Sequence, residues 1–263
     1  MTHSSPVLFR WSAWNLSRCS CELLQYSVAS FRRAFGSNAR YVIFTDEPMA
    51  LSDHAKSGVE ILAYDAFPNR EFDDIGSVTP WRKWCPTPRF APGTSELFVD
   101  SDVFLLSDPT ELREFLCGSN SSATGYLAMQ ESLPERWTLG RLESRVQLDV
   151  PPVNAGVIGQ RGDADIGPAL RRQYEWWQQN VPVSSATPHD EQGALVALLT
   201  TVRDRLALLP ENRYRIVSPR SNASVRDAAG LALVHATYPD HPAFETFRPA
   251  IKSYISEGGR RAM

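Results

Sequence analysis

The sequence predicts an α/β fold with a mixed, mostly parallel sheet flanked by helices. Its first 46 residues have the pattern of strand, helix and strand, which is the unit of a parallel sheet. The run Leu97-Phe98-Val99 has no polar residue, as is typical of a strand covered on both faces. No internal repeat and no low-complexity linker interrupts the 263 residues, so we expect a single domain over residues 1–263.

The expected strands are short runs of apolar, β-branched or aromatic residues next to turn-forming residues. They cover residues 7–9, 40–46, 59–64, 97–99, 125–130, 154–159, 205–209, 214–217 and 231–234. Between the first strand and the first helix, residues 12–20 show no clear period and predict a loop.

The expected helices carry apolar residues at helical spacing. They cover residues 21–35, 52–57 and 164–180, and two further segments that begin at Asp108 and His189. Residues 131–150 are polar with scattered apolar side chains, and we interpret them as a mobile lid.

Composition excludes several classes of protein. The 27 basic and 30 acidic residues create no field that would attract nucleic acid or a membrane surface. No stretch is long and apolar enough for a transmembrane segment. The N-terminus lacks the basic start and apolar segment of a signal peptide, so a cytoplasmic location is expected.

Asp100 and Asp102 follow the apolar strand at its carboxyl end. Burying charge without a partner is costly, so a carboxylate pair in this apolar frame calls for a cation or a strong hydrogen-bond network. Oxygen ligands in this arrangement suit Mg²⁺ or Mn²⁺, which keep open positions for phosphate oxygens. The alternative is a pair of turn or capping aspartates at a strand end.

Three other places carry candidate chemistry. Arg82 and Lys83 lie between two tryptophans and could neutralise a diphosphate, or they could be the solvent face of a helix that buries the tryptophans. Asp190 and Glu191 open a helix, where acidic residues normally serve the helix dipole. His235 ends an apolar strand, where a lone histidine is more often structural than a ligand.

The order of three motifs resembles the GT-A glycosyltransferases, especially the glycogenin-like and bacterial galactosyltransferase-like group. These motifs are the strand ending in Asp100-Ser101-Asp102, the later Asn154-Ala155-Gly156-Val157, and the strand ending in His235. The resemblance implies a Rossmann-like sheet that binds a nucleotide-diphosphate sugar, with a UDP-sugar favoured. It also implies hexosyl transfer to a glycan, a protein or a small molecule, with retention of configuration.

The resemblance implies roles for twelve residues. Asp100, Asp102 and His235 would hold Mn²⁺ or Mg²⁺, and Asp190 or Glu191 would act beside the anomeric carbon. The donor would contact Phe9, Trp11, Arg82, Lys83, Ser101, Asn154 and Ala155. Where the family often carries a glycine and a lysine after the late histidine, this chain has Tyr238-Pro239-Asp240-His241-Pro242.

Two alternatives remain open at the level of sequence. The chain could bind a sugar nucleotide without turning it over. A strand followed by Asp-x-Asp also begins the haloacid-dehalogenase-type phosphohydrolases, but those proteins carry the motif on their first strand.

Overall fold

The computed structural model describes residues 7–68, 71–72, 80–117, 124–131, 136–146, 153–217, 229–237 and 242–257. Its strands are β1 (Val7–Ala13), β2 (Arg40–Thr45), β3 (Glu60–Ala63), β4 (Ser95–Val99), β5 (Val103–Leu105), β6 (Tyr126–Gln130), β7 (Val153–Gln160), β8 (Leu206–Leu209), β9 (Tyr214–Val217) and β10 (Leu233–Ala236).

The α-helices are α1 (Arg18–Phe35), α2 (Ser52–Lys56), α3 (Thr110–Cys117), α4 (Gly167–Asn180), α5 (Asp190–Thr200) and α6 (Pro242–Glu257). Short 3-10 helices are η1 (Gly36–Asn38), η2 (Pro48–Leu51), η3 (Tyr64–Ala66), η4 (Pro80–Trp84), η5 (Arg136–Arg145), η6 (Val183–Ser185) and η7 (Arg203–Arg205). None of the helices in the described ranges has the length and apolar character that crossing a membrane requires.

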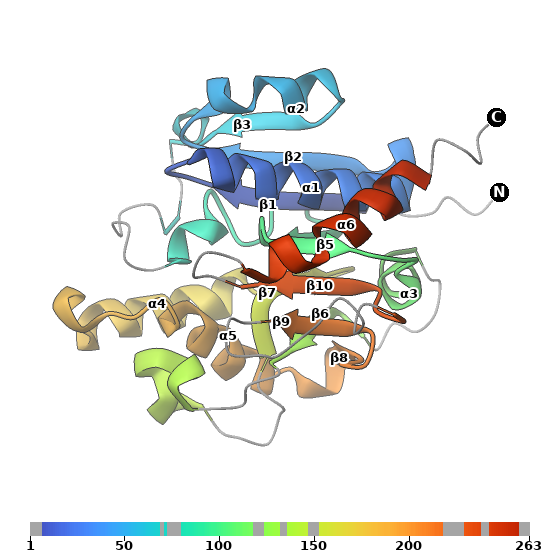
Figure 1. The fold of residues 1–263 in the computed structure, drawn as a ribbon. Helices are drawn as coiled ribbons and strands as arrows, with labels where there is room; N and C mark the ends of the chain where they lie inside the picture. Colours follow the sequence, from blue (N-terminus) through green and yellow to red (C-terminus); the bar gives the residue numbers. More distant parts are fainter. Residues whose placement is uncertain are drawn as a thin grey trace.

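The strands form two sheets in the described part of the chain. The larger has the order β3-β2-β1-β4-β7-β6-β8, and the smaller has the order β5-β10-β9. In the larger sheet β3, β2, β1 and β4 run parallel, as do β6 and β8, whereas β7 is antiparallel to both of its neighbours. The predicted mixed, mostly parallel sheet flanked by helices is therefore confirmed. Figure 1 shows β3 and α2 at one end of the molecule and α4, α5 and β8 at the other.

Helix α1 covers β1 with the apolar face that its periodicity predicts. Ser17 caps its first turn by accepting from the backbone N–H of Ser20. Leu24, Val28 and Phe31 are buried in the same core cluster as Phe9 and Trp11 of β1. Burying such side chains contributes about 1.5–3 kcal/mol each.

Three local expectations differ from the structure. Strand β1 continues to Ala13, so the loop before α1 is shorter than predicted. Strand β5, which belongs to the smaller sheet, has no counterpart among the expected strands. Helix α6, which packs on α1, β5 and β10, has no counterpart among the expected elements. Part of the expected lid forms η5, and residues 132–135 and 147–150 lie outside the described residues.

Candidate functional site

The turn between β4 and β5 brings two carboxylates and an imidazole together. One ligand atom from each of Asp100, Asp102 and His235 lies within 4.8 Å of the other two. Nε2 of His235 is 3.1 Å from Oδ1 of Asp102. Two carboxylates and an imidazole are a donor set that fits Mn²⁺ or Mg²⁺, with the remaining positions open.

Backbone pairing fixes this arrangement. The turn closes with the N–H of Val103 donating to Asp100 O at 3.2 Å, while the N–H of Asp100 donates to Gly156 O at 2.8 Å. Strand β10 runs antiparallel to β5 with His235 opposite Val103, and the N–H of Ala236 donates to Asp102 O at 2.9 Å. The histidine therefore arrives beside the aspartates through sheet register, from more than a hundred residues away.

Strand β7 passes directly behind the imidazole. Nδ1 of His235 lies 2.9 Å from Oδ1 of Asn154. A Cβ at Gly156 would lie 2.4 Å from Cε1 of His235, so this close approach requires a glycine. The small residues of the Asn154-Ala155-Gly156 run thus make room for the histidine ring.

Lys83 is buried between two of the acidic groups. Its Nζ is 3.3 Å from Oδ2 of Asp100 and 3.3 Å from Oε2 of Glu191, and it donates to Ala155 O at 3.4 Å. Burial lowers the pKa of Lys83, but Asp100 and Glu191 outweigh that effect and raise the pKa above its ordinary value. The lysine therefore places a fixed positive charge next to the candidate metal site.

Glu191 is 1% exposed and is held by two donors. The indole Nε1 of Trp84 donates to its Oε1 at 2.6 Å, and Lys83 pairs with its other oxygen. Burial raises the pKa of Glu191 to about 7, although Lys83 acts in the opposite direction. For His235, burial lowers the pKa, but the neighbouring Asp102 carboxylate outweighs burial and the pKa is raised.

Asp190 points to a different part of the molecule. Its two oxygens accept from Nε1 of Trp177, from the N–H and Oγ1 of Thr187, and from the N–H of Arg141, at 2.7–3.1 Å. These bonds join α5 to α4 and η5. Only Glu191 of the predicted acidic pair reaches the cluster.

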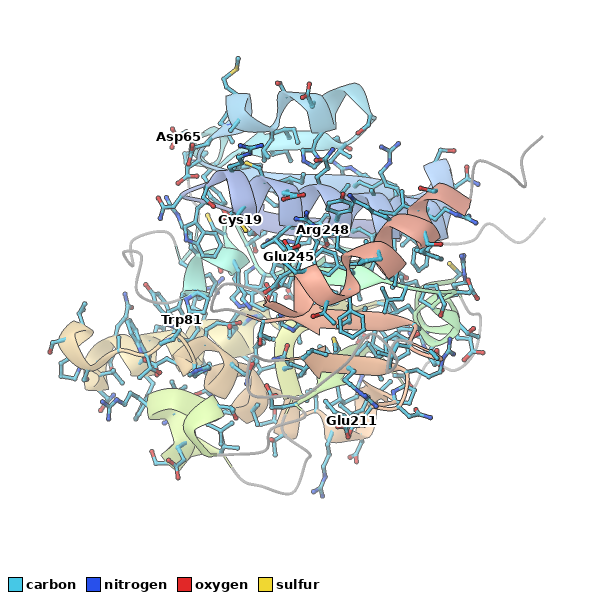
Figure 2. The ribbon with its side chains drawn as sticks, viewed as in Figure 1. Cys19, Asp65, Trp81, Glu211, Glu245 and Arg248 are labelled. Atoms are coloured by element: carbon cyan, nitrogen blue, oxygen red, sulfur yellow. The ribbon has the colours of Figure 1, made fainter. Side chains whose placement is uncertain are left out.

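The two cations between the tryptophans also separate. Arg82 is partly exposed, with Nη1 3.2 Å from Oδ2 of Asp46 and its guanidinium over the ring of Tyr64. Figure 2 shows Trp81 beside α4, where it packs against Tyr174 and Trp177. The two tryptophans are thus buried as the structural alternative expected, while Lys83 turns inward rather than to solvent.

The side chains of Phe9 and Trp11, two of the implied donor contacts, lie in the core. Both side chains are 0% exposed and lie inside β1, under α1. Nε1 of Trp11 donates to Oγ of Ser27 at 3.0 Å, and Phe9 stacks on Tyr41. The expected strand ended at Phe9, whereas β1 continues to Ala13, so Trp11 lies within the strand and not beyond it.

The remaining predicted contacts lie at or near the cluster. Ser101 is the middle residue of the turn that carries the two aspartates and is partly buried. Ala155 meets Lys83 through its carbonyl and donates its N–H to Oε1 of Gln192 at 3.3 Å. The side chain of Asn154 is 6% exposed and faces His235.

Sequence reasoning missed Glu131 as a residue of the site and placed Gln192 near it without giving it a role. The amide of Gln192 donates to Oε2 of Glu131 at 3.2 Å and to Thr138 O at 3.2 Å. Glu131 directly follows β6, so a carboxylate at a strand's carboxyl end was the available signal. Nothing local showed that β6 ends beside Asn154.

The chain is similar to known proteins in its structure. No protein-family model matches the chain, and no curated protein matches its sequence. The solved structure of an active-site mutant of the galactosyltransferase LgtC has a TM-score of 0.54 and 13% identity, covering 96% of this chain and 95% of that one.

Two further solved structures are similar. Mouse xyloside xylosyltransferase 1 has a TM-score of 0.56 and 11% identity over 90% of this chain and 99% of its own. The glycosyltransferase GlyE of Streptococcus pneumoniae has a TM-score of 0.54 and 15% identity over 96% of this chain and 61% of its own. The chain therefore has the fold of the GT-A glycosyltransferases.

Proposed function

We propose that this protein is a metal-dependent glycosyltransferase that moves a sugar from a nucleotide-diphosphate sugar, with a UDP-sugar favoured, to an acceptor hydroxyl. One observation carries the proposal: Asp100, Asp102 and His235 converge beside the buried Lys83–Glu191 pair. The similarity to glycosyltransferase structures supports the same class of reaction. The sheet edge on which the cluster lies is where open α/β sheets bind ligands.

Asp100, Asp102 and His235 would hold Mn²⁺ or Mg²⁺. When bound, such a cation supplies positive charge that stabilises the departing diphosphate. Lys83 adds a second positive charge on the same side, because it contacts Asp100 directly. Arg82 of η4 is partly exposed and pairs with Asp46, and its guanidinium would face a phosphate from the solvent side.

Glu191 is our candidate for the group that acts on the sugar. The transition state of glycosyl transfer is oxocarbenium-like, and a nearby carboxylate stabilises its positive charge. The carboxylate of Glu191 is linked to the metal cluster through Lys83, which contacts both Glu191 and Asp100. The carboxylate of Asp190 instead accepts hydrogen bonds from four donors elsewhere. We further propose that the configuration at the anomeric carbon is retained.

The position of the Asp-x-Asp turn disfavours the phosphohydrolase alternative, because this turn follows β4 and not the first strand. The binding module without turnover remains the second outcome of the functional experiment.

A panel of UDP- and GDP-sugars tests the proposal, with melting temperature measured in the presence and absence of Mn²⁺. A donor at 100 times its dissociation constant stabilises the protein by about 2.7 kcal/mol. We expect Mn²⁺-dependent stabilisation by a UDP-sugar that is lost in Asp102→Asn, and release of UDP on incubation. Equal UDP affinity in wild type and Asp102→Asn would contradict the metal assignment, and binding without release of UDP would indicate a binding module.

The roles of the two acidic residues can be separated once a donor is known. Glu191→Gln should lower turnover by about a hundredfold or more with little change in nucleotide affinity. Asp190→Asn should instead lower stability, because an amide nitrogen would then face N–H donors, at about 1–3 kcal/mol for each donor left unpaired. Turnover of Glu191→Gln near that of wild type would refute the assignment.

A further inference from the structure

The side chain of Asn154 contacts four polar partners, and their chemistry fixes the orientation of its amide. The backbone N–H of Gly156 approaches one end at 2.8 Å. A backbone N–H can only donate, so the atom it meets must be the carbonyl oxygen Oδ1. Oδ1 has no hydrogen and can only accept.

The same oxygen lies 2.9 Å from Nδ1 of His235. Since Oδ1 only accepts, Nδ1 must carry a hydrogen for this contact to be favourable. In the neutral ring the lone pair is then on Nε2, which lies 3.1 Å from Oδ1 of Asp102. Nε2 is therefore the nitrogen that faces the candidate metal site.

The other end of the amide is held just as firmly. Nδ2 of Asn154 donates to Oε2 of Glu131 at 3.0 Å and to Oε1 of Gln192 at 3.1 Å. Gln192 cannot exchange its own amide ends, because its Oε1 also accepts from the N–H of Ala155. A reversed Asn154 amide would place oxygen against the Glu131 carboxylate and NH₂ against the N–H of Gly156.

We propose that Asn154, oriented by Glu131, is a positioning residue that keeps the hydrogen of His235 on Nδ1 and leaves Nε2 free to bind the cation. This inference rests on the proposed metal site. Metal binding needs an unprotonated ring nitrogen, and which one is free is decided by the hydrogen bond made by the other. The Asn154 amide contacts His235 through its oxygen and Glu131 and Gln192 through its nitrogen, so its side chain acts through the histidine.

The first experiment determines the tautomer without any metal. Asp102→Ala removes the carboxylate that faces Nε2, and long-range ¹H–¹⁵N spectra of the metal-free variant are recorded at a pH where the ring is neutral. The signals of His235 are identified by their loss in His235→Gln. We expect the hydrogen on Nδ1, and a hydrogen on Nε2 instead would overturn the proposal.

Variants of the two positioning residues complete this test. In the Asp102→Ala background, Asn154→Ala should move the hydrogen largely to Nε2, and Glu131→Ala should give a mixture because the amide can then rotate. An unchanged Nδ1 hydrogen in the Asn154→Ala combination would show that another group sets the tautomer. Should that combination not fold, the Asp102→Ala spectrum alone still decides which nitrogen carries the hydrogen.

The second experiment measures the dissociation constant of Mn²⁺ by electron paramagnetic resonance with Asp102 intact. Loss of such an orienting partner typically weakens metal binding 10–100-fold, and we expect this for Asn154→Ala. Gln130→Ala is the matched control, since Gln130 is the last residue of β6, directly before Glu131, but donates to Leu209 O. Equal Mn²⁺ affinity in Asn154→Ala and wild type would refute the positioning role. A wild type that binds no Mn²⁺ would refute the metal site itself, and the tautomer measurement would still decide whether Asn154 orients His235.

Discussion

At the scale of single residues, Lys83 and Glu191 form a buried ion pair beside the candidate metal site. Two carboxylates, those of Asp100 and Glu191, compete for one ammonium group. Burial dominates for Glu191 and raises its pKa to about 7. The folded protein therefore binds more protons at Glu191 than the unfolded chain does between pH 4.5 and about 7.

This shift predicts how Glu191→Gln changes stability with pH. In the wild type the contribution of Glu191 to the free energy of unfolding falls as pH rises through this window, by about 3 kcal/mol at 1.36 kcal/mol per pKa unit. Gln does not titrate, so the variant does not lose this stability as pH rises. Its free energy of unfolding relative to that of wild type should therefore rise by about 3 kcal/mol from pH 4.5 to pH 8. Urea denaturation at both pH values measures the difference.

Glu60→Gln is the matched control for that prediction. Glu60 is exposed, and its hydrogen bond from Arg40 lowers its pKa. Its contribution to stability is present at neutral pH and is lost on acidification, so the variant should show no relative gain at pH 8. A Glu191→Gln variant whose relative stability is the same at both pH values would contradict the assigned shift.

The second prediction at the scale of single residues concerns Gly156. A Cβ there would lie 2.4–2.5 Å from the His235 ring and 2.9 Å from Oδ1 of Asn154. Gly156→Ala should cost about 1–3 kcal/mol through overpacking and should also weaken Mn²⁺ binding by displacing the ring. Calorimetry of Mn²⁺ binding and thermal unfolding measure the two effects.

Gly159→Ala separates the two effects. Gly159 lies on the same strand, and a Cβ there would lie 2.6 Å from Phe115 and 2.9 Å from Leu127. It should lose stability while keeping its Mn²⁺ affinity. Equal Mn²⁺ affinity for the two variants would show that Gly156 does not position the histidine.

At the scale of elements, strand β1 holds the segment that carries Lys83. Arg10 is fully buried and donates to Thr87 O at 2.6 Å and to Cys85 O at 3.0 Å. It also pairs with Glu96 of β4 at 3.3 Å, and Ser12 donates to Lys83 O at 2.7 Å. A parallel strand in the core thereby fixes the irregular backbone that brings Lys83 to the site.

Removing that anchor should be costly. Breaking a buried ion pair by removing one partner costs about 3–5 kcal/mol, so Arg10→Ala should lower the free energy of unfolding by that amount. Arg40→Ala is the control, because the Arg40–Glu60 pair is 46% and 44% exposed and such pairs contribute at most about 1 kcal/mol. Urea denaturation of both variants checks the contrast, and similar losses would refute the anchoring role of Arg10.

At the scale of the whole molecule, the candidate metal site lies where the two sheets meet. Asp100 and Asp102 lie between β4 of the larger sheet and β5 of the smaller, and His235 lies on β10 of the smaller. A bound cation would therefore contact both sheets, and we expect it to stabilise the smaller one.

Hydrogen exchange tests this coupling. With Mn²⁺ and UDP at 100 times the dissociation constant, amides of β5 and β10 that exchange through opening of the smaller sheet should slow by up to about a hundredfold. Asp102→Asn should show no such protection. Protection confined to β1 and β2 would show that the nucleotide binds without the cation bridging the sheets.

Much of the fold could be predicted from local patterns. Helical and alternating apolar spacing correctly indicated α1, α4 and α5 and most strands of both sheets, because side-chain periodicity follows directly from local backbone geometry. The local patterns failed at element ends, where β1 continues into the expected loop and buries Trp11. They also left out α6, whose apolar face is buried by contacts with α1 and the smaller sheet.

The sequence by itself determined which residues carry chemistry: the Asp100–Asp102 turn, the Asn154-Ala155-Gly156 run, the acidic start of α5 and His235. Only the tertiary structure decided which of them meet. It selected Lys83 over Arg82 and Glu191 over Asp190 for the cluster, and it added Glu131 behind Asn154. The side chains of adjacent residues point in different directions. Residues far apart in the sequence come together only through strand pairing and helix packing, which no local pattern specifies.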